Sequence, residues 1–401
     1  MLCPRRLVLL SLLTTLLFGC ASPPSQTDKA SAIDANSTTG TTLNTTSNTA
    51  SGNTAGSGSV GSGGTIASGS ASTSSRFDPS SRPQTESARR ATINRFGVDL
   101  ATQRNLSESK VLALLDEARY NPTVARIVAP AAPGQPRAPR SWATYRARVV
   151  EPIRISQGQA YMQQYAAELD RATVRYGVPQ NIIAAIIGVE TLYGKSQGTF
   201  RVLDSLTTLS FDYPDASRPD RAEMFRGQLA DLIELDLTGR VDARTLKGSF
   251  AGAVGIPQFM PGSIKRFAVS ARGAQDINLS GNMADAIASV ANFLVEHGWQ
   301  RGLPIFVPVR LPASVDKLVD GGLKPTLDWP QLQAAGAKFA PGAKEAPWMR
   351  AALGVIDLPE DNAGTVELRT ATQNFFTITQ YNRSYFYAAS VVDLAQALAE
   401  H

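Results

Sequence analysis

The chain has 401 residues, a formal net charge of +5 and a hydrophobic fraction of 43%. This length predicts about two to three domains, and the mild positive charge fits an anionic polymer or a lipid surface without choosing between them. Only two histidines and two cysteines are present, which leaves almost no material for Ser-His-Asp or Cys-His catalysis or for a zinc site. Carboxylate chemistry is what remains.

Residues 1–20 are predicted to be a lipoprotein signal peptide. Arg5 and Arg6 precede an apolar run over 7–18 that is shorter than the roughly 20 residues needed to span a bilayer. The alternative is a short membrane anchor. Leu17-Phe18-Gly19-Cys20 resembles a bacterial lipobox, and this resemblance implies cleavage before Cys20 and lipidation of that residue.

The expected location is the periplasmic face of the outer membrane, through a lipid anchor on Cys20. Ala21 follows the cysteine, which resembles the outer-membrane default of Gram-negative lipoproteins. An exported lipoprotein has no access to nucleic acid, so we expect no nucleic-acid partner. Residues 21–75 are dominated by Ser, Thr, Gly, Asn and Ala and cannot bury enough apolar surface to fold, so they are predicted to be a disordered tether.

Residues 76–302 are predicted to form a helical domain. Gly177 and Gly194 are expected to end helices, and Pro179 is expected to lie in the first turn of one. A Pro- and Ala-rich stretch over 127–140 is expected to be a loop. Apolar residues at helical spacing predict helices over 89–96, 107–120, 142–153, 159–176, 181–193, 204–209, 221–237, 262–271 and 283–297.

The character of the sequence changes after Gly298. β-formers over 303–311, 365–369 and 375–379 predict strands, and residues 303–378 are expected to form a small α+β subdomain. Residues 379–401 are expected to supply a last helix, over 385–398, that packs back on the core. The predicted fold class is therefore mainly α (α+β), with a small mixed α/β subdomain.

Glu190 is the strongest candidate for carboxylate chemistry. It lies in the last turn of the predicted helix over 181–193, whose other positions are nearly all apolar. Burial disfavours the charged form of a carboxyl group, and the negative end of the helix dipole acts in the same direction. Such a group stays protonated near neutral pH, as a general acid must. The alternative is a structural glutamate paired with Lys195 or Arg201.

Two further clusters carry polar groups that suit sugars. In the Gly- and Ala-rich stretch 247–261, Ser249 and Gln258 are the polar members, although small residues at this density also fit a tight helix crossing. In the stretch 381–387, aromatic rings alternate with amide and hydroxyl groups. This combination suits a sugar ring, and equally the edge of an ordinary core.

Taken together, these clusters resemble the lytic murein transglycosylase B family from about Trp142 to the C-terminus. Gly188-Val189-Glu190-Thr191 with Tyr193-Gly194 is similar to the catalytic helix of that family. The remaining blocks follow in the order of the family: 203–206, 209–214, 247–253, 258–261, 277–279, 289–292, 297–299 and 378–384.

The resemblance implies a lysozyme-like helical catalytic core in which Glu190 is the only catalytic carboxylate. It implies that Ser249 and Gln258 contact the N-acetyl groups of the sugars. The other residues that match cleft positions of the family are Tyr145, Arg221, Tyr381, Asn382 and Tyr387. The implied substrate is the glycan strand of peptidoglycan, cut between MurNAc and GlcNAc to leave 1,6-anhydro-MurNAc ends. Cell-wall synthesis or division proteins are the candidate protein partners.

The chain departs from the family pattern at three places. Asp220-Arg221 stands where paired arginines are frequent, and Ile256-Pro257 stands where Tyr-Gly is frequent. Some members carry a calcium loop before Ile-Asn-Leu, but the stretch 270–276 lacks acids at alternating positions. We therefore predict no metal and no cofactor. The alternatives in function are a hydrolytic muramidase with a second acid, Asp204 or Asp212, and a non-catalytic lipoprotein that binds glycan as a scaffold.

Overall fold

The computed structural model describes residues 85–131, 134, 138–273, 276–312 and 316–400. The predicted signal peptide, its Cys20 and nearly all of the residues before Glu86 lie outside this part of the chain. Its α-helices are α1 (Glu86–Arg104), α2 (Glu108–Asp116), α3 (Pro122–Val128), α4 (Trp142–Val149), α5 (Pro152–Gln164), α6 (Ala166–Tyr176), α7 (Gln180–Thr191), α8 (Val202–Phe211), α9 (Pro219–Leu237), α10 (Pro261–Phe267), α11 (Met283–Glu296), α12 (Trp329–Ala334), α13 (Gln373–Ile378) and α14 (Tyr385–Ala399).

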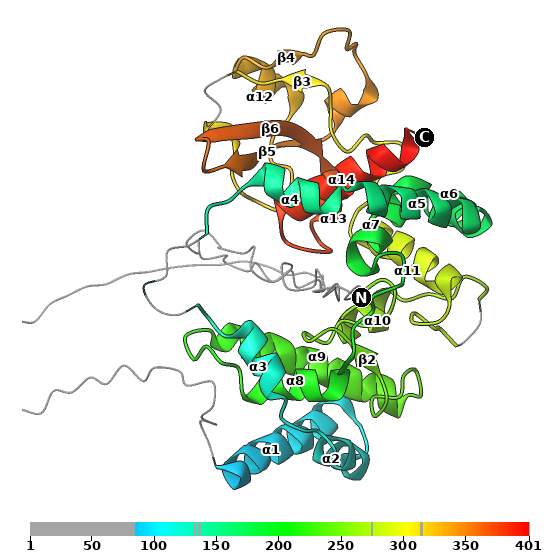
Figure 1. Ribbon diagram of the computed structural model, residues 1–401, viewed down its shortest axis with the longest axis vertical. Coiled ribbons are helices and arrows are strands. Elements are labelled where there is room, and N and C mark those ends of the chain that lie inside the picture. The colour runs from blue at the N-terminus through cyan, green and yellow to red at the C-terminus, as the bar shows by residue number, and fades with distance from the viewer. Residues whose placement is uncertain (1–84, 132–133, 135–137, 274–275, 313–315, 401) are drawn as a thin grey trace, which may run out of the picture. The chain divides into compact units, whose positions relative to one another are not determined.

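Helix α7 is the central element of the core (Figure 1). It packs against α5, α6, α11 and α14, and this explains why its sequence is apolar on every side. The residues from Ile182 to Gly188 are all buried. Gly177 adopts a left-handed φ of 72° and ends α6, as predicted, while Pro179 lies one residue before α7 rather than within its first turn.

Helices α8, α9 and α10 form a second packed group, in which α9 contacts both α8 and α10. Helices α1 and α2 pack against each other, and each also contacts this group. The Arg89 guanidinium on α1 bonds the Asp212 carboxylate after α8 at 2.8 Å, and both side chains are buried. A buried pair of this kind ties the two segments together, because removing one partner would leave the other charge unpaired.

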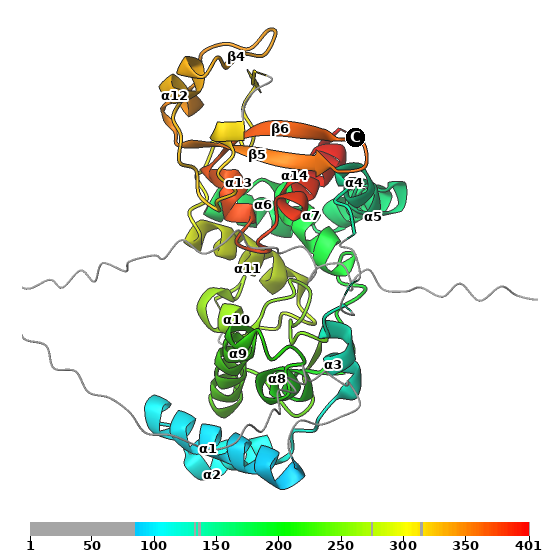
Figure 2. The same cartoon turned by 90° about the vertical axis from the view of Figure 1, so that its left-hand side faces the viewer.

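The strands pair locally as antiparallel ribbons: β1 (Phe200–Arg201) with β2 (Lys247–Gly248), β3 (Val309–Arg310) with β4 (Lys338–Phe339), and β5 (Leu353–Glu360) with β6 (Thr365–Thr372). The β5–β6 hairpin lies beside α4 and α14, as Figures 1 and 2 show. A separate apolar cluster around Trp329 and Trp348 lies on the β3–β4 side. Among the described residues, 3₁₀ turns also occur at Asp316–Leu318 and Pro347–Arg350.

The prediction of a strand over 375–379 is wrong, because residues 373–378 form helix α13. Thr372 caps the helix by accepting a hydrogen bond from the Asn374 N–H. Phe375, Phe376 and Ile378 are all buried against β6 and α14. Burial on more than one face, together with the cap, therefore outweighs the β propensity of these residues.

Three smaller predictions also need correction. The strand expected over 303–311 is reduced to Val309–Arg310, while strand β5 was not predicted because Gly354 and Pro359 interrupt its pattern. Helix α3 overlaps the start of the expected loop and is capped by Asn121. None of the described helices combines the length and the apolar character needed to cross a membrane.

Candidate active site

Glu190 lies in the last turn of α7 and is only 9% exposed. The helix ends directly after it, because Leu192, Tyr193 and Gly194 adopt positive φ angles of 50°, 60° and 88°. Left-handed backbone is costly for residues other than glycine, so the two consecutive residues Leu192 and Tyr193 need support from their surroundings.

Tyr193 supplies that support. Its hydroxyl donates a hydrogen bond to the Arg154 carbonyl at 3.0 Å, and its ring lies against Gly158 of α5 and Gly188 of α7. A Cβ at Gly188 would come within 2.6 Å of the ring, so only glycine fits there. The slot between these two glycines therefore fixes the end of α7 and, with it, the position of Glu190.

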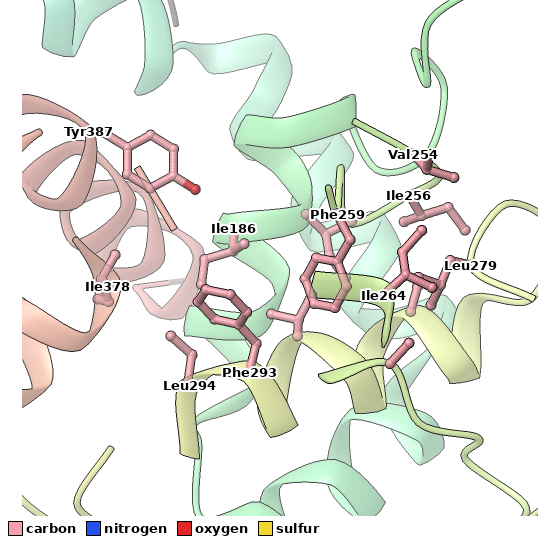
Figure 3. Packing of buried hydrophobic residues seen from close by; sticks show 14 of the residues in the cluster. Ile186, Val254, Ile256, Phe259, Ile264, Leu279, Phe293, Leu294, Ile378 and Tyr387 are labelled. Atoms are coloured by element: carbon pink, nitrogen blue, oxygen red, sulfur yellow. The ribbon is translucent and has the colours of Figure 1, made fainter. Parts of the chain in front are cut away.

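Three tyrosines surround the Glu190 carboxyl group. The Tyr387 hydroxyl on α14 donates a hydrogen bond to Glu190 Oε1 at 2.6 Å, and Figure 3 shows this side chain directed toward α7. Burial, followed by the nearby Glu190 carboxylate, raises the pKa of Tyr145 to about 12. The pKa of Tyr381 is raised well above its usual value by the same two causes. The structure thus brings together four residues that the sequence analysis singled out.

Burial raises the pKa of Glu190 to about 7, although the hydrogen bond from Tyr387 acts in the opposite direction. The alternative of an ion pair with Lys195 or Arg201 is not what the structure has. Arg201 bonds Asp204 at 3.1 Å, and no ion pair to Glu190 occurs within the described residues. A buried carboxyl group without a cation holds its proton near neutral pH and can donate it.

The raised pKa predicts that Glu190→Gln stabilises the fold, but only at higher pH. Below about pH 4.5 the carboxyl is protonated in the folded and unfolded chains alike, so the substitution changes little. Above about pH 7 the folded state contains a buried charge, and Gln is expected to raise the free energy of unfolding by about 3 kcal/mol. Urea unfolding at pH 4.5 and pH 8.5 measures this. An equal effect at both pH values would contradict it.

Ser249 and Gln258 lie on one irregular segment between β2 and α10. Ser249 is 4% exposed, and its Oγ accepts a hydrogen bond from the Ala253 N–H at 3.0 Å. Gln258 has a φ of 51° and donates through Nε2 to the carbonyls of Gly255 and Gln197, at 2.8 and 3.2 Å. Its Oε1 accepts no hydrogen bond from the described part of the chain. This oxygen is therefore available to accept an N–H group.

The segment that carries Ser249 and Gln258 is bound to the acid-bearing helix and to the tyrosines. Thr191, next to Glu190 in the chain, donates from its buried hydroxyl to the Ile256 carbonyl at 2.8 Å. The Tyr381 hydroxyl donates to the Pro257 carbonyl at 2.8 Å. Hydrogen bonds therefore connect the end of the helix that carries Glu190 with the segment that carries the predicted sugar contacts.

Two predicted site residues, Arg221 and Asn382, are not bonded to Glu190 in the part of the chain that the structure describes. Arg221 lies in the first turn of α9, which packs on α8 and α10. Asn382 is half-buried in the turn between α13 and α14, next to Tyr381. No hydrogen bond or ion pair within the described residues links Arg221 or the Asn382 side chain to Glu190. Neither residue is therefore bonded directly to the carboxyl group within the described part of the chain.

The two acids considered as a second catalytic carboxylate are engaged elsewhere. Asp212 bonds the buried Arg89 guanidinium at 2.8 Å. Asp204 bonds Arg201 and accepts a hydrogen bond from the Arg119 N–H at 2.9 Å. Both acids therefore perform structural tasks, which argues against the two-carboxylate alternative.

The described residues contain no cluster of three or more His, Cys, Asp or Glu side chains that could hold a metal ion. Asp285 of α11 is buried, and its carboxylate accepts hydrogen bonds from the N–H groups of Ala271 and Asn278, on either side of the loop before Ile277, at 2.9 and 3.1 Å. The Asp285 carboxylate thus joins the two ends of this loop through direct hydrogen bonds.

Sequence reasoning missed the residues that hold the site in place. It assigned no role to Thr191, Tyr193 or Gly158, although Thr191 and Tyr193 lie in the motif over 188–194. Gly158 lies about thirty residues before Glu190 in the chain, and nothing in the local pattern connects it to Tyr193. A glycine in the middle of a helix is itself a signal, because it costs stability there unless packing requires it.

Comparison with known proteins identifies the family of the chain. Residues 88–396 match the model of the transglycosylase SLT domain family. The chain is 38% identical over 313 residues to membrane-bound lytic murein transglycosylase B of Escherichia coli (strain K12), covering 77% of this chain and 80% of that relative.

Two solved structures from Pseudomonas aeruginosa are also similar. Catenated lytic transglycosylase SltB1 has a TM-score of 0.67 and 32% identity, covering 77% of this chain and 97% of its own. SltB3 in complex with NAG-anhNAM-pentapeptide has a TM-score of 0.62 and 28% identity, covering 77% of this chain and 79% of its own. The chain therefore belongs to the family of lytic transglycosylases that carry the transglycosylase SLT domain.

Proposed function

We propose that this lytic murein transglycosylase cleaves the β-1,4 bond between MurNAc and GlcNAc in peptidoglycan glycan strands, with Glu190 as the single acid and base. The observation that carries the proposal is the Glu190 carboxyl, buried, free of ion pairs within the described residues and bonded by Tyr387 at 2.6 Å. The pKa of Glu190, raised by burial to about 7, keeps the group protonated at the start of the reaction. The complex of SltB3 with NAG-anhNAM-pentapeptide supports this substrate class.

In the first step, Glu190 donates its proton to the glycosidic oxygen, and the bond from that oxygen to C1 of MurNAc breaks. The GlcNAc fragment leaves with a hydroxyl group at C4. The carbonyl oxygen of the MurNAc 2-acetamido group stabilises the positive charge that develops at C1. The substrate thereby supplies the function that a second carboxylate provides in ordinary glycosidases.

In the second step, the ionised Glu190 takes the proton from the C6 hydroxyl of the same MurNAc. The C6 oxygen attacks C1 and closes a 1,6-anhydro ring, so no water is consumed. Attack within one molecule can lower a barrier by about 7–11 kcal/mol when the geometry is fixed. The tyrosines around Glu190 exclude water, which favours ring closure over hydrolysis.

Other residues of the site are assigned to binding. Gln258 Oε1 is available to accept the N–H of an N-acetyl group, while the Ser249 hydroxyl can donate to its carbonyl. Tyr145, Tyr381 and Tyr387 line the carboxyl, and Asn382 and Arg221 are assigned to more distant sugar or peptide contacts. The division into a catalytic domain over 76–302, a subdomain over 303–378 and a C-terminal helix remains part of this proposal.

We further propose that Cys20 carries a lipid anchor that holds the enzyme at the periplasmic face of the outer membrane. The support is the lipobox-like sequence and the membrane-bound relative of E. coli. Metabolic labelling with a palmitate analogue tests it. The wild-type chain is expected to incorporate label and to fractionate with membranes, and Cys20→Ala is expected to do neither.

The products distinguish lytic cleavage from hydrolysis. Digestion of purified sacculi is expected to release fragments whose MurNAc ends are lighter than reducing ends by one water, about 18 Da, because ring closure retains no water oxygen. Mass spectrometry before and after borohydride treatment measures this, since anhydro ends are not reduced. Reducible ends as the main product would support the muramidase alternative. Binding to sacculi without any release would support the non-catalytic scaffold.

A further inference from the structure

A network of charged side chains lies outside the site and joins three elements. Asp393 on α14 is 8% exposed, and its Oδ2 bonds Arg146 Nε of α4 at 2.5 Å. Its Oδ1 bonds Arg369 Nη1 of β6 at 2.6 Å. Arg369 also bonds Glu367 through Nε at 2.6 Å. One largely buried carboxylate therefore holds two guanidinium groups that come from different elements.

Aromatic contacts connect this network to Tyr145. Glu367 Oε2 accepts a hydrogen bond from Trp142 Nε1 at 3.1 Å, and the Arg369 guanidinium lies 5.5 Å from the Trp142 ring centre. Trp142 and Tyr145, one turn apart on α4, both pack against Phe386 of α14, with ring centres 5.4 and 5.5 Å apart. The face of α4 that carries Tyr145 is thereby fixed on α14.

We propose that Asp393 is a positioning residue for the lytic reaction: by binding Arg146 and Arg369 it holds α4 on α14, and so holds Tyr145 beside Glu190. This inference rests on the proposed function, in which Glu190 is the acid. Tyr387 belongs to α14 itself and reaches Glu190 by its own hydrogen bond. Tyr145 is different, because it comes from α4, a helix of only eight residues whose placement depends on its neighbours.

The burial of Asp393 indicates that its two ion pairs, with Arg146 and Arg369, stabilise the position of α4. We call these three residues the Asp393 clamp. Arg146 is 47% exposed, and a pair between two exposed side chains would contribute little. Asp393, however, is nearly buried and receives charge-assisted hydrogen bonds from both arginines. Such a carboxylate cannot lose its partners without exposing an unpaired charge to the protein interior, so it keeps α4 and β6 in place.

Loss of the ion pairs of Asp393 is expected to change the protonation of Glu190. The titratable groups that face Glu190 are Tyr145 from α4, Tyr387 from α14 and Tyr381 from the preceding turn. If Tyr145 moves away, water reaches the carboxyl group, and the burial that favours its protonated form is weakened. The acid would then lose its proton at lower pH, which a purely structural defect elsewhere would not cause.

The test uses the full-length enzyme and soluble glycan strands prepared from sacculi. Arg146→Gln keeps Asp393 paired with Arg369 and should fold, while Asp393→Asn removes the negative charge that both arginines share. For both, kcat is expected to fall about tenfold with KM changed less than about twofold. In a plot of kcat against pH, kcat falls at high pH because the acid loses its proton. This alkaline limb is expected to move to lower pH by about one unit. An unmoved limb in both variants overturns the proposal.

Asp231→Asn is the matched control. Asp231 is 13% exposed and also lies between two cations, at 2.8 Å from Arg104 and 3.6 Å from Lys265. It ties α1 and α10 to α9, and neither it nor its partners form a hydrogen bond or ion pair with Glu190 within the described residues. This variant is expected to lose stability while its alkaline limb stays in place. A shift equal to that of Arg146→Gln would mean that any loss of stability moves the limb, which would also overturn the proposal.

A double substitution separates action through Tyr145 from other routes. In a Tyr145→Ala background, adding Arg146→Gln is expected to produce no further fall in kcat and no further shift of the limb. Additive effects would show that the clamp does not act through Tyr145. Glu190→Gln, measured in parallel, keeps the two ideas distinguishable. If Glu190→Gln retains turnover, Glu190 is not the acid. If the alkaline limb of the kcat profile stays in place in Arg146→Gln and Asp393→Asn, only the positioning of Tyr145 by Asp393 is rejected.

Discussion

Glu190→Gln is expected to lower the turnover of glycan strands by about 10³-fold. The glutamine side chain has nearly the same shape and can still accept the hydrogen bond from Tyr387, so the site should remain intact. What it lacks is a proton that can be given to the glycosidic oxygen and later replaced from the C6 hydroxyl. Release of soluble fragments from purified sacculi, followed over time, measures the effect.

Asp204→Asn is the control for this experiment. Asp204 belongs to α8, is bonded by Arg201 at 3.1 Å and makes no bond to Glu190 within the described residues. It is expected to cost stability while retaining turnover in the folded fraction. Binding of Glu190→Gln to sacculi should equal that of the wild type, which shows that the loss lies in the chemical step. Fragment release at the wild-type rate by Glu190→Gln would reject the role assigned to this carboxyl.

Gly198→Ala is expected to be the most damaging of the conservative substitutions near the site. Gly198 has a φ of 90°, and a Cβ there would come within 2.6 Å of the Ser249 N atom and closer still to the Gly248 carbonyl. Both contacts are backbone, so no side chain can move aside. The strained φ and the overlap together are expected to lower the free energy of unfolding by about 3 kcal/mol. Urea unfolding measures this loss.

Gly239→Ala separates the cost of the positive φ from the cost of the steric overlap. Gly239 has a similar φ of 72°, but no atom lies within 4 Å of the Cβ that alanine would add. Its expected cost is that of the backbone conformation alone, about 1 kcal/mol. Gly198→Ala is also expected to lower activity in the folded fraction, because the neighbouring Gln197 carbonyl accepts the hydrogen bond that orients Gln258. Equal losses of stability in both variants would show that close packing at Gly198 is unimportant.

Helix α7 shows how far local reasoning reaches in this chain. Its apolar positions, together with Pro179 and Gly194, predicted a buried helix over 181–193, and the structure has α7 over Gln180–Thr191, ending at the left-handed Leu192 rather than at Gly194. The burial of Glu190 followed from the same pattern. These features are set by residues within a dozen positions of one another, so the sequence contains the needed information.

Helix α13 shows where such reasoning fails. Residues 375–379 have β propensity, yet the chain there is helical because β6 and α14 cover more than one face of the segment. Propensity is a weak preference that packing between distant segments overrides. The neighbours that decide the outcome are known only once the fold is known.

The site itself could be predicted only in part from the residues. Position alone pointed to Glu190, and the mixture of aromatic and polar groups indicated the stretch 381–387. Tyr145, and the cleft positions of Tyr381 and Tyr387, were identified only through the family resemblance. They reach the carboxyl from segments that lie about 45 residues before it and about 190 residues after it in the chain. No spacing rule connects such positions. The tasks of Tyr193 and Asp393 depend in the same way on contacts between distant segments.

The hydroxyl of Thr191 has a consequence for how the enzyme responds to its polymer. It binds the Ile256 carbonyl on the segment that carries Gln258, and it also accepts a hydrogen bond from the Gly194 N–H at 3.0 Å. These two hydrogen bonds tie the segment that carries Gln258 to the end of α7, one residue from Glu190. Under the proposed function, binding of an acetamido group at Gln258 and alignment of Glu190 are therefore coupled, and a strand that lacks N-acetyl groups is expected to be bound more weakly and cut more slowly.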